Sequence, residues 1–150
     1  MSVPTNKTSI MTPRTKTIAS WILRGLAAFI LLQTLFFKFT GAAESVYVFS
    51  SLGVEPWGRI GTGVLELIAS ALILWPRTTA IGALLALGLM GGALLTHFFI
   101  LGIAVQNDGG QLFLYALIVF ISAAVLVIWY RQQLLSYIPT RFIPARFSRI

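Results

Sequence analysis

The stretch Gln111–Tyr130, QLFLYALIVFISAAVLVIWY, contains no charged side chain and decides which kind of fold this chain adopts. A helix needs about 20 apolar residues to cross the hydrocarbon core of a membrane, which is about 30 Å thick. Three apolar runs precede this one: Ile18–Phe39, Ile60–Trp75 and Thr79–Val105. The second of them reaches spanning length if its helix begins near Pro56–Trp57, because proline is tolerated in a first turn. The sequence therefore predicts an all-α integral membrane protein with four spans.

Composition and charge agree with this prediction. Hydrophobic residues make up 57% of the chain and charged residues only 10%, less than half the share that is usual in a soluble domain. The net charge of +7 comes from basic residues that flank the spans, so we expect no nucleic-acid partner. Because basic residues mark the cytoplasmic side, we expect a cell (inner) membrane protein with both termini cytoplasmic. The basic tails are then expected to meet anionic lipid headgroups.

Turn residues divide the chain and order its spans. The predicted parts are a basic cytoplasmic N-terminal tail (1–17), a four-span membrane domain (18–131) and a basic cytoplasmic C-terminal tail (132–150). The connections at Arg77–Thr79 and Asn107–Gly110 are short, so they predict antiparallel neighbours. Short connections between four spans indicate a four-helix up-down-up-down bundle.

Two further patterns concern helix surfaces. Gly41–Pro56 is too polar to span, and its apolar residues predict a short outer-surface helix between spans one and two. Small residues four apart let helices approach closely and predict contacts within the bundle. These pairs are Gly58/Thr62, Gly82/Ala86 and Gly88/Gly92.

Four ionisable side chains lie inside the apolar runs: Arg24, Lys38, Glu66 and His97. Such residues are costly in lipid, so each indicates either a functional site or a structural pair. Lys38, Glu66 and His97 belong to three different spans, and their positions along those spans place all three in the outer half. Arg24 lies about 21 Å from Lys38 towards the cytoplasm. We predict a buried polar site formed by Lys38, Glu66 and His97, with Arg24 and Asp108 as second-rank candidates.

Each candidate also has a purely structural interpretation. Lys38 and Glu66 can form one buried ion pair that fixes helix register. His97 can hydrogen-bond a carbonyl or Thr96, and Arg24 can snorkel to phosphates or cap the carbonyl end of another helix. The chain has no cysteine and a single histidine. Its carboxylates have no recognised metal-ligand spacing, so we predict no metal site.

Several motifs carry a family resemblance. In order, they are Arg24-Gly25 through Phe29, Phe37-Lys38-Phe39, Phe49-x-x-Leu52-Gly53-x-x-Pro56, Glu66 within GVLEL, Trp75-Pro76-Arg77, Ala93-x-x-Thr96-His97-Phe98 and Asp108-Gly109-Gly110. In this order the chain resembles the DoxX-like family of small four-helix membrane proteins, from Arg24 to Arg131. One departure is Leu35, which stands where the family usually has a glycine three residues before the lysine.

The resemblance implies a membrane subunit associated with redox processes, because relatives include the membrane subunit of a thiosulfate:quinone oxidoreductase. The implied ligand is a quinone. Lys38 and His97 would donate hydrogen bonds to its carbonyl oxygens, and Glu66 would accept or relay a proton. We expect apolar walls from Phe36, Phe37, Phe98 and Phe99. We do not expect an enzyme on its own, but a part of a quinone-linked oxidoreductase.

Two other functions stay open at this point. The chain can be a membrane scaffold that anchors a partner protein through its basic tails or outer segment, with the polar residues serving structure alone. It can also be a proton-coupled small-molecule transporter with Glu66 as the proton carrier. Four short helices then require a homo-oligomer.

Overall fold

The structure is a computed structural model and describes residues 12–137, within which all regular structure is helical. The elements are α1 (Pro13–Thr40), α2 (Ala43–Ser51), α3 (Trp57–Leu74), α4 (Thr79–Thr96), the π-helical segment η1 (His97–Leu101), α5 (Gln111–Trp129) and α6 (Arg131–Tyr137). The helices α1, α3, α4 with η1, and α5 are long and apolar enough to cross a membrane. The predicted all-α fold with four spans is confirmed. Much of both predicted tails lies outside the described residues.

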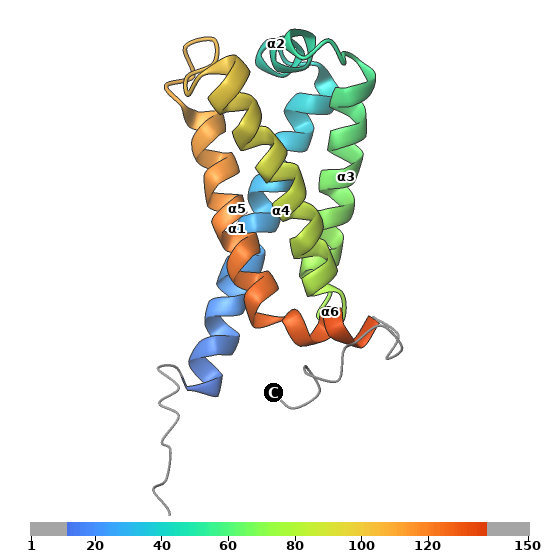
Figure 1. The fold of residues 1–150 in the computed structure, drawn as a ribbon, viewed down its shortest axis with the longest axis vertical. Coiled ribbons are helices and arrows are strands. Elements are labelled where there is room, and N and C mark those ends of the chain that lie inside the picture. The colour runs from blue at the N-terminus through green and yellow to red at the C-terminus, as the bar shows by residue number, and fades with distance from the viewer. Residues whose placement is uncertain (1–11, 138–150) are drawn as a thin grey trace, which may run out of the picture.

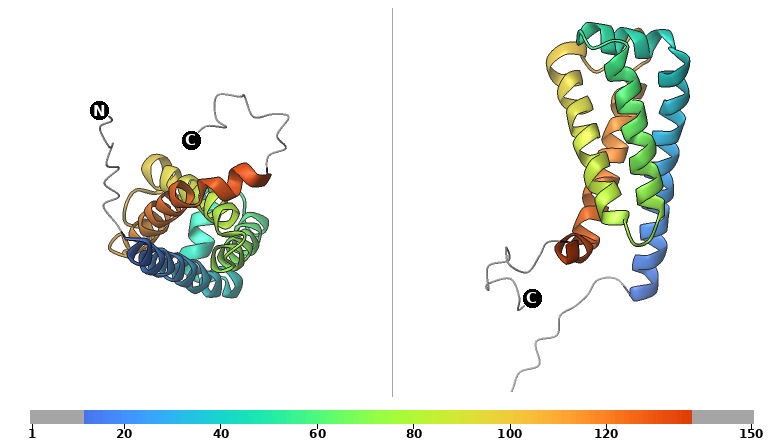
Figure 2. Two further views of the ribbon diagram at one scale, coloured as in Figure 1. Left: turned by 90° about the horizontal axis from the view of Figure 1, so that it is seen from below. Right: turned by 90° about the vertical axis from the view of Figure 1, so that its right-hand side faces the viewer.

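The four long helices form a ring. Each packs against two others: α1 and α4 both contact α3 and α5, and the view along the bundle in Figure 2 shows the resulting four-sided arrangement. In Figure 1, α2 and the loop before α5 lie at one end of the bundle, and α6 with the α3–α4 turn lies at the other. We call these the α2 end and the α6 end.

Small side chains form much of the interior. Ala27, Ala69, Ala83, Ala86 and Ala123 are almost fully buried, together with Leu31, Ile73, Val119 and Leu126. A Cβ atom on Gly82 would lie 2.5 Å from the backbone nitrogen of Ile73, so α4 approaches α3 as closely as a glycine permits. A Cβ atom on Gly88 or Gly92 would meet nothing within 4 Å. The expected bundle contact at Gly88/Gly92 is therefore wrong, because both face outward.

The ends of two spans differ from the apolar runs. Helix α1 begins ahead of Ile18, because Thr12 caps its first turn and Pro13 occupies the first position. Span three was expected to continue to Val105, but α4 ends at Thr96 and η1 closes the span at Leu101. Gly102 then reverses the chain at φ 79°, a backbone conformation that favours glycine.

Both short helices contact the bundle. Helix α2 packs against α1, α3 and η1. It confirms the short helix predicted between spans one and two, and Gly53 follows it at φ 69°. At the other end, the side chain of Gln133 in α6 accepts a hydrogen bond from Ala80 N (3.2 Å) and donates one to Pro76 O (2.8 Å). The hydroxyl of Tyr137 donates to Arg77 O. Helix α6 is therefore tied to the α3–α4 turn.

Candidate functional site

A cavity of about 430 Å³ lies inside the ring at the α2 end. Its walls come from all four spanning segments, from α2 and from the loop before α5. Lys38, Glu66 and His97 all line it, and Asp108 lines it as well. The structure thus brings the three first-rank candidates and one second-rank candidate to the same cavity. Arg24 is not among the lining residues.

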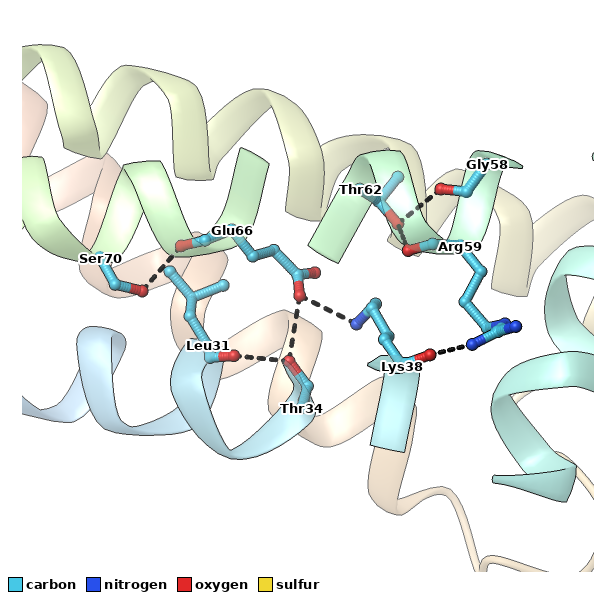
Figure 3. A network of polar contacts seen from close by, with 8 residues as sticks. All are labelled: Leu31, Thr34, Lys38, Gly58, Arg59, Thr62, Glu66 and Ser70. Carbon is cyan, nitrogen blue, oxygen red and sulfur yellow. Dashed lines mark hydrogen bonds and ion pairs between the residues drawn. The ribbon is translucent and has the colours of Figure 1, made fainter. Parts of the chain in front are cut away.

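Lys38 and Glu66 form an ion pair across the α1–α3 interface. The distance from Lys38 Nζ to Glu66 Oε2 is 2.9 Å, and the side chains are 15% and 4% exposed. Thr34, one turn before Lys38, lies with its hydroxyl 3.1 Å from the same Oε2 and 2.8 Å from Leu31 O. Figure 3 shows Lys38 and Thr34 both directed at this one oxygen. The pair is therefore the buried contact that one interpretation of the sequence anticipated.

Local sequence explains why these side chains meet. Thr34 and Lys38 are four residues apart, so they share a face of α1. Helix α1 ends just beyond Lys38, where Gly41 adopts the left-handed conformation at φ 69°. On α3, the hydroxyl of Ser70 donates to Glu66 O at 2.8 Å. Neighbouring polar groups on two packed helices thus hold the pair.

Arg59 is a buried polar residue beside the cavity that the sequence interpretation missed. It is 8% exposed, and its Nε donates to both carboxylate oxygens of Glu55 at 2.8 and 3.0 Å. Its Nη1 donates to Lys38 O, as Figure 3 shows. Arg59 therefore joins the end of α1 to the start of α3. The four-residue spacing between Glu55 and Arg59 is a signal that sequence reasoning had available.

His97 occupies the first position of η1 and is 5% exposed. Its Nδ1 lies 2.8 Å from Gly102 O. Because a carbonyl oxygen only accepts hydrogen bonds, Nδ1 carries the proton of this bond. In a neutral imidazole with its proton on Nδ1, Nε2 is the nitrogen that can accept a hydrogen bond. The ring also makes an edge contact with Phe113, with centroids 5.7 Å apart. The expected hydrogen bond between His97 and a carbonyl is present.

Asp108 shapes the loop at the rim of the cavity. Its Oδ1 accepts hydrogen bonds from Val105 N and Gly110 N, both at 2.8 Å, and its Oδ2 accepts one from Leu112 N at 3.0 Å. Burial acts to raise the pKa of Asp108, but these three backbone donors hold that pKa below its usual value. Asp108 therefore stabilises the start of α5, with its carboxylate already engaged.

Arg24 belongs to the other half of the bundle. Its Nε donates to Ile73 O at 2.8 Å, and its Nη2 donates to Leu74 O. The guanidinium carbon lies 3.9 Å from the ring centroid of Trp21. These contacts cap the carbonyl end of α3, which was one of the two structural interpretations of this residue. Arg24 is thus separate from the cavity.

The expected aromatic walls are largely wrong. Of the four phenylalanines, only Phe37 lines the cavity. Phe36, Phe98 and Phe99 are 67%, 65% and 81% exposed, because they sit on the outer faces of α1 and η1. The apolar lining instead includes Ile30, Leu31, Val48, Phe49, Leu89 and Met90. Among residues 12–137, no group of three His, Asp or Glu side chains is arranged to hold a metal ion.

Comparison with known proteins gives one family. A family model described as the DoxX-like family matches residues 22–125, which is more than half of the chain. The matched segment contains Lys38, Glu66, His97 and Asp108, and therefore the polar lining of the cavity that these four residues supply. No curated protein and no solved structure matches the chain.

Proposed function

The chain belongs to the DoxX-like family, and we propose that it is a membrane subunit that binds a quinone-type molecule in the cavity at the α2 end. It is a small multi-pass membrane protein with four helices able to span the bilayer. The observation that carries the proposal is the meeting of three ionisable side chains from three spanning segments at one cavity. In a membrane protein such residues are retained at a cost, which favours a functional role.

The size and lining of the cavity support a small organic ligand. Small-molecule sites typically enclose about 300–1,000 Å³ and combine apolar walls with a few converging polar groups, and this cavity of about 430 Å³ has both. A quinone-type ring has apolar faces and polar oxygens at its edge. Phe37, Phe49 and Met90 suit the faces, and the ammonium of Lys38 suits an oxygen.

The distribution of charged residues supports one orientation of the bundle in the membrane. Basic residues gather towards the α6 end: Arg14, Lys16, Arg77 and Arg131. At the α2 end, Arg59 and Lys38 are paired with Glu55 and Glu66. By the positive-inside rule, the α6 end and both termini face the cytoplasm of a cell (inner) membrane. The cavity then lies in the outer half, and the basic end meets anionic headgroups.

The proposed role is co-catalytic. Lys38, Glu66 and His97 can bind oxygen atoms and exchange protons. The chain has no cysteine, so any thiol chemistry has to come from a partner protein. We therefore propose that this subunit holds the quinone-type molecule within the membrane for a redox partner, and that it is not an enzyme on its own.

The test is to identify the small molecules that purify with the protein in mild detergent, using mass spectrometry. The variant Ala93→Leu adds three carbon atoms to the cavity wall, and Ala71→Leu makes the same change at an exposed position of α3. We expect a quinone-type molecule with the wild type and Ala71→Leu, and its loss in Ala93→Leu. A preparation that holds a constant protein partner but no small molecule would instead favour the scaffold function.

A further inference from the structure

Two hydrogen-bond acceptors at the cavity have no donor within the described part of the chain. Glu66 receives both of its contacts, from Lys38 and Thr34, on Oε2. Its Oε1 receives no hydrogen bond from a described residue, and no dashed line reaches it in Figure 3. His97 uses Nδ1 for its bond to Gly102 O, which leaves the lone pair of Nε2 without a partner.

Both unpaired atoms belong to residues that line the cavity. Over residues 12–137, every fully buried side-chain nitrogen or oxygen atom has a hydrogen-bond partner. An atom without a partner must therefore retain some accessible surface. Glu66 and His97 are only 3% and 5% exposed, and both line the cavity. We infer that Glu66 Oε1 and His97 Nε2 are the acceptors available to a molecule bound in the cavity.

The cavity also offers a donor. The ammonium group of Lys38 has three N–H bonds, and within residues 12–137 its ion-pair contact is with Glu66 Oε2. The lining thus presents donors from one side chain and free acceptors from two. A bound molecule matches it only if its polar head both donates and accepts hydrogen bonds.

The two redox forms of a quinone-type head differ in this respect. The oxidised form carries carbonyl oxygens, which accept from Lys38 but leave Glu66 Oε1 and His97 Nε2 without a donor. The reduced form carries two O–H groups, each of which donates and accepts. Leaving a buried acceptor unpaired is costly. The hydrogen-bond inventory of the cavity therefore favours the reduced form.

The charges that line the cavity also restrict the charge of the ligand. The carboxylates of Glu44, Glu66 and Asp108 line the cavity, and Lys38 supplies the positive charge. An anionic head would meet like charges there, at a cost that a low-dielectric site increases. A neutral head avoids that cost.

We propose that the cavity selects a neutral dihydroxy-aromatic head, the hydroquinone form, over the corresponding quinone. Glu66 Oε1 and His97 Nε2 accept its O–H groups, and the ammonium of Lys38 donates to one of its oxygens. This inference rests on the proposed function, since it names the form of ligand that the same site takes.

The test compares three ligands with one ring and one decyl tail: the hydroquinone, the quinone and the dimethyl ether of the hydroquinone. Binding to the wild-type protein in detergent is measured by calorimetry under oxygen-free conditions. We expect the hydroquinone to bind at least about tenfold more tightly than the other two, as a lost hydrogen bond implies. Equal affinities, or tighter binding of the quinone, would overturn the inference and leave the proposed function standing. Failure of all three to bind would count against the proposed function itself.

A matched pair of variants tests whether the carboxylate of Glu66 sets the preference for the hydroquinone. Glu66→Gln replaces a carboxylate by an amide, whose NH₂ group can donate to a carbonyl oxygen. We expect the ratio of quinone to hydroquinone dissociation constants to fall several-fold in this variant. Glu55→Gln makes the same change at a carboxylate that is paired with Arg59 and does not line the cavity, and it is expected to keep the wild-type ratio. An unchanged ratio in a folded Glu66→Gln protein would contradict the assignment. The wild-type ligand series decides the question even if this variant does not fold.

Discussion

The two halves of the bundle differ in how fully the neighbouring groups pair the cation that α1 supplies to each half. Helix α1 supplies one to each half, Arg24 towards the α6 end and Lys38 towards the α2 end. The guanidinium of Arg24 bonds to the last carbonyl groups of α3 and stacks on Trp21. Among the described residues, Lys38 pairs with one carboxylate oxygen of Glu66, and the other oxygen receives no hydrogen bond. Low exposure alone therefore does not separate a fully paired charge from one that lies beside an unpaired polar atom. We base the proposed functional role on the second feature.

The α6 half and the α2 half of the bundle also differ in how tightly their helices pack. Near the α6 end, Gly82 brings the backbones of α3 and α4 together, and side chains such as Ile73 and Leu126 are fully buried. At the α2 end, the ring encloses about 430 Å³ instead. We interpret the α6 half as the scaffold that holds the helices and the α2 half as the site. The following predictions test this division, from the largest expected effect to the smallest.

Gly82→Ala should cause the largest loss of stability. Its Cβ atom would lie 2.5 Å from Ile73 N and 2.8 Å from Ala69 O, so the backbones of α3 and α4 must separate, at a cost of about 3 kcal/mol. Gly88→Ala makes the same change on the same helix where nothing lies within 4 Å. Thermal unfolding in detergent should show a much lower Tm for Gly82→Ala alone. Equal Tm values would contradict close packing of the α6 half.

Arg24→Met should lower the free energy of unfolding by about 2 kcal/mol, because it removes charged hydrogen bonds to Ile73 O and Leu74 O. Ligand affinity at the cavity should stay unchanged, since Arg24 does not line it. Chemical unfolding and a binding titration on the same preparation measure the two quantities. A fall in affinity with unchanged stability would reverse the roles that we assign to the two halves.

Lys38→Met should cost about 1–2 kcal/mol of stability, in the range of polar contacts in membranes, because Glu66 then lacks its partner. The double variant Lys38→Met/Glu66→Gln should recover most of this loss, since no unpaired charge remains. Neither variant should bind ligand as the wild type does. Full binding by the double variant would mean that the ion pair serves only to fix the helices.

Asp108→Asn should have the smallest effect, a loss of about 1 kcal/mol at neutral pH, as for a removed helix cap. The pKa of Asp108 is lowered in the folded protein, so its carboxylate stabilises the fold above the unfolded pKa of about 3.9. That contribution disappears as the pH falls through the folded pKa. The difference in Tm between the wild type and Asp108→Asn should therefore shrink in acid. A difference that grows in acid would contradict the pKa direction.

Much of the fold could be predicted from the sequence, because the membrane imposes length and apolarity on every span. The same cost made Arg24, Lys38, Glu66 and His97 stand out. The depths of Lys38, Glu66 and His97 along their helices were enough to predict that they lie together, and all three line one cavity. These features depend on distance along the chain, which a sequence states directly.

The features that could not be predicted depend on rotation about a helix axis. In η1, His97 faces the cavity and Phe98 and Phe99 face outward, and hydropathy does not record the π-helical turn that sets this direction. The outward direction of Gly88 could not be predicted either. In a membrane-spanning helix the lipid-facing side is as apolar as the packed side, so the sequence does not show which side faces the bundle. Arg59 lies in the first turn of α3 and donates a hydrogen bond to Lys38 O across the helix ends, a contact that hydropathy does not record.

Photoaffinity labelling tests the central claim most directly. An azido derivative of the decyl hydroquinone would be bound to the wild-type protein, irradiated and mapped by peptide mass spectrometry, with the unlabelled ligand as competitor. We expect competable labels on cavity residues of α1, α2 and α4, such as Phe37, Phe49 and Met90. Competable labels confined to the α6 end, around Arg24 or Trp21, would contradict that claim.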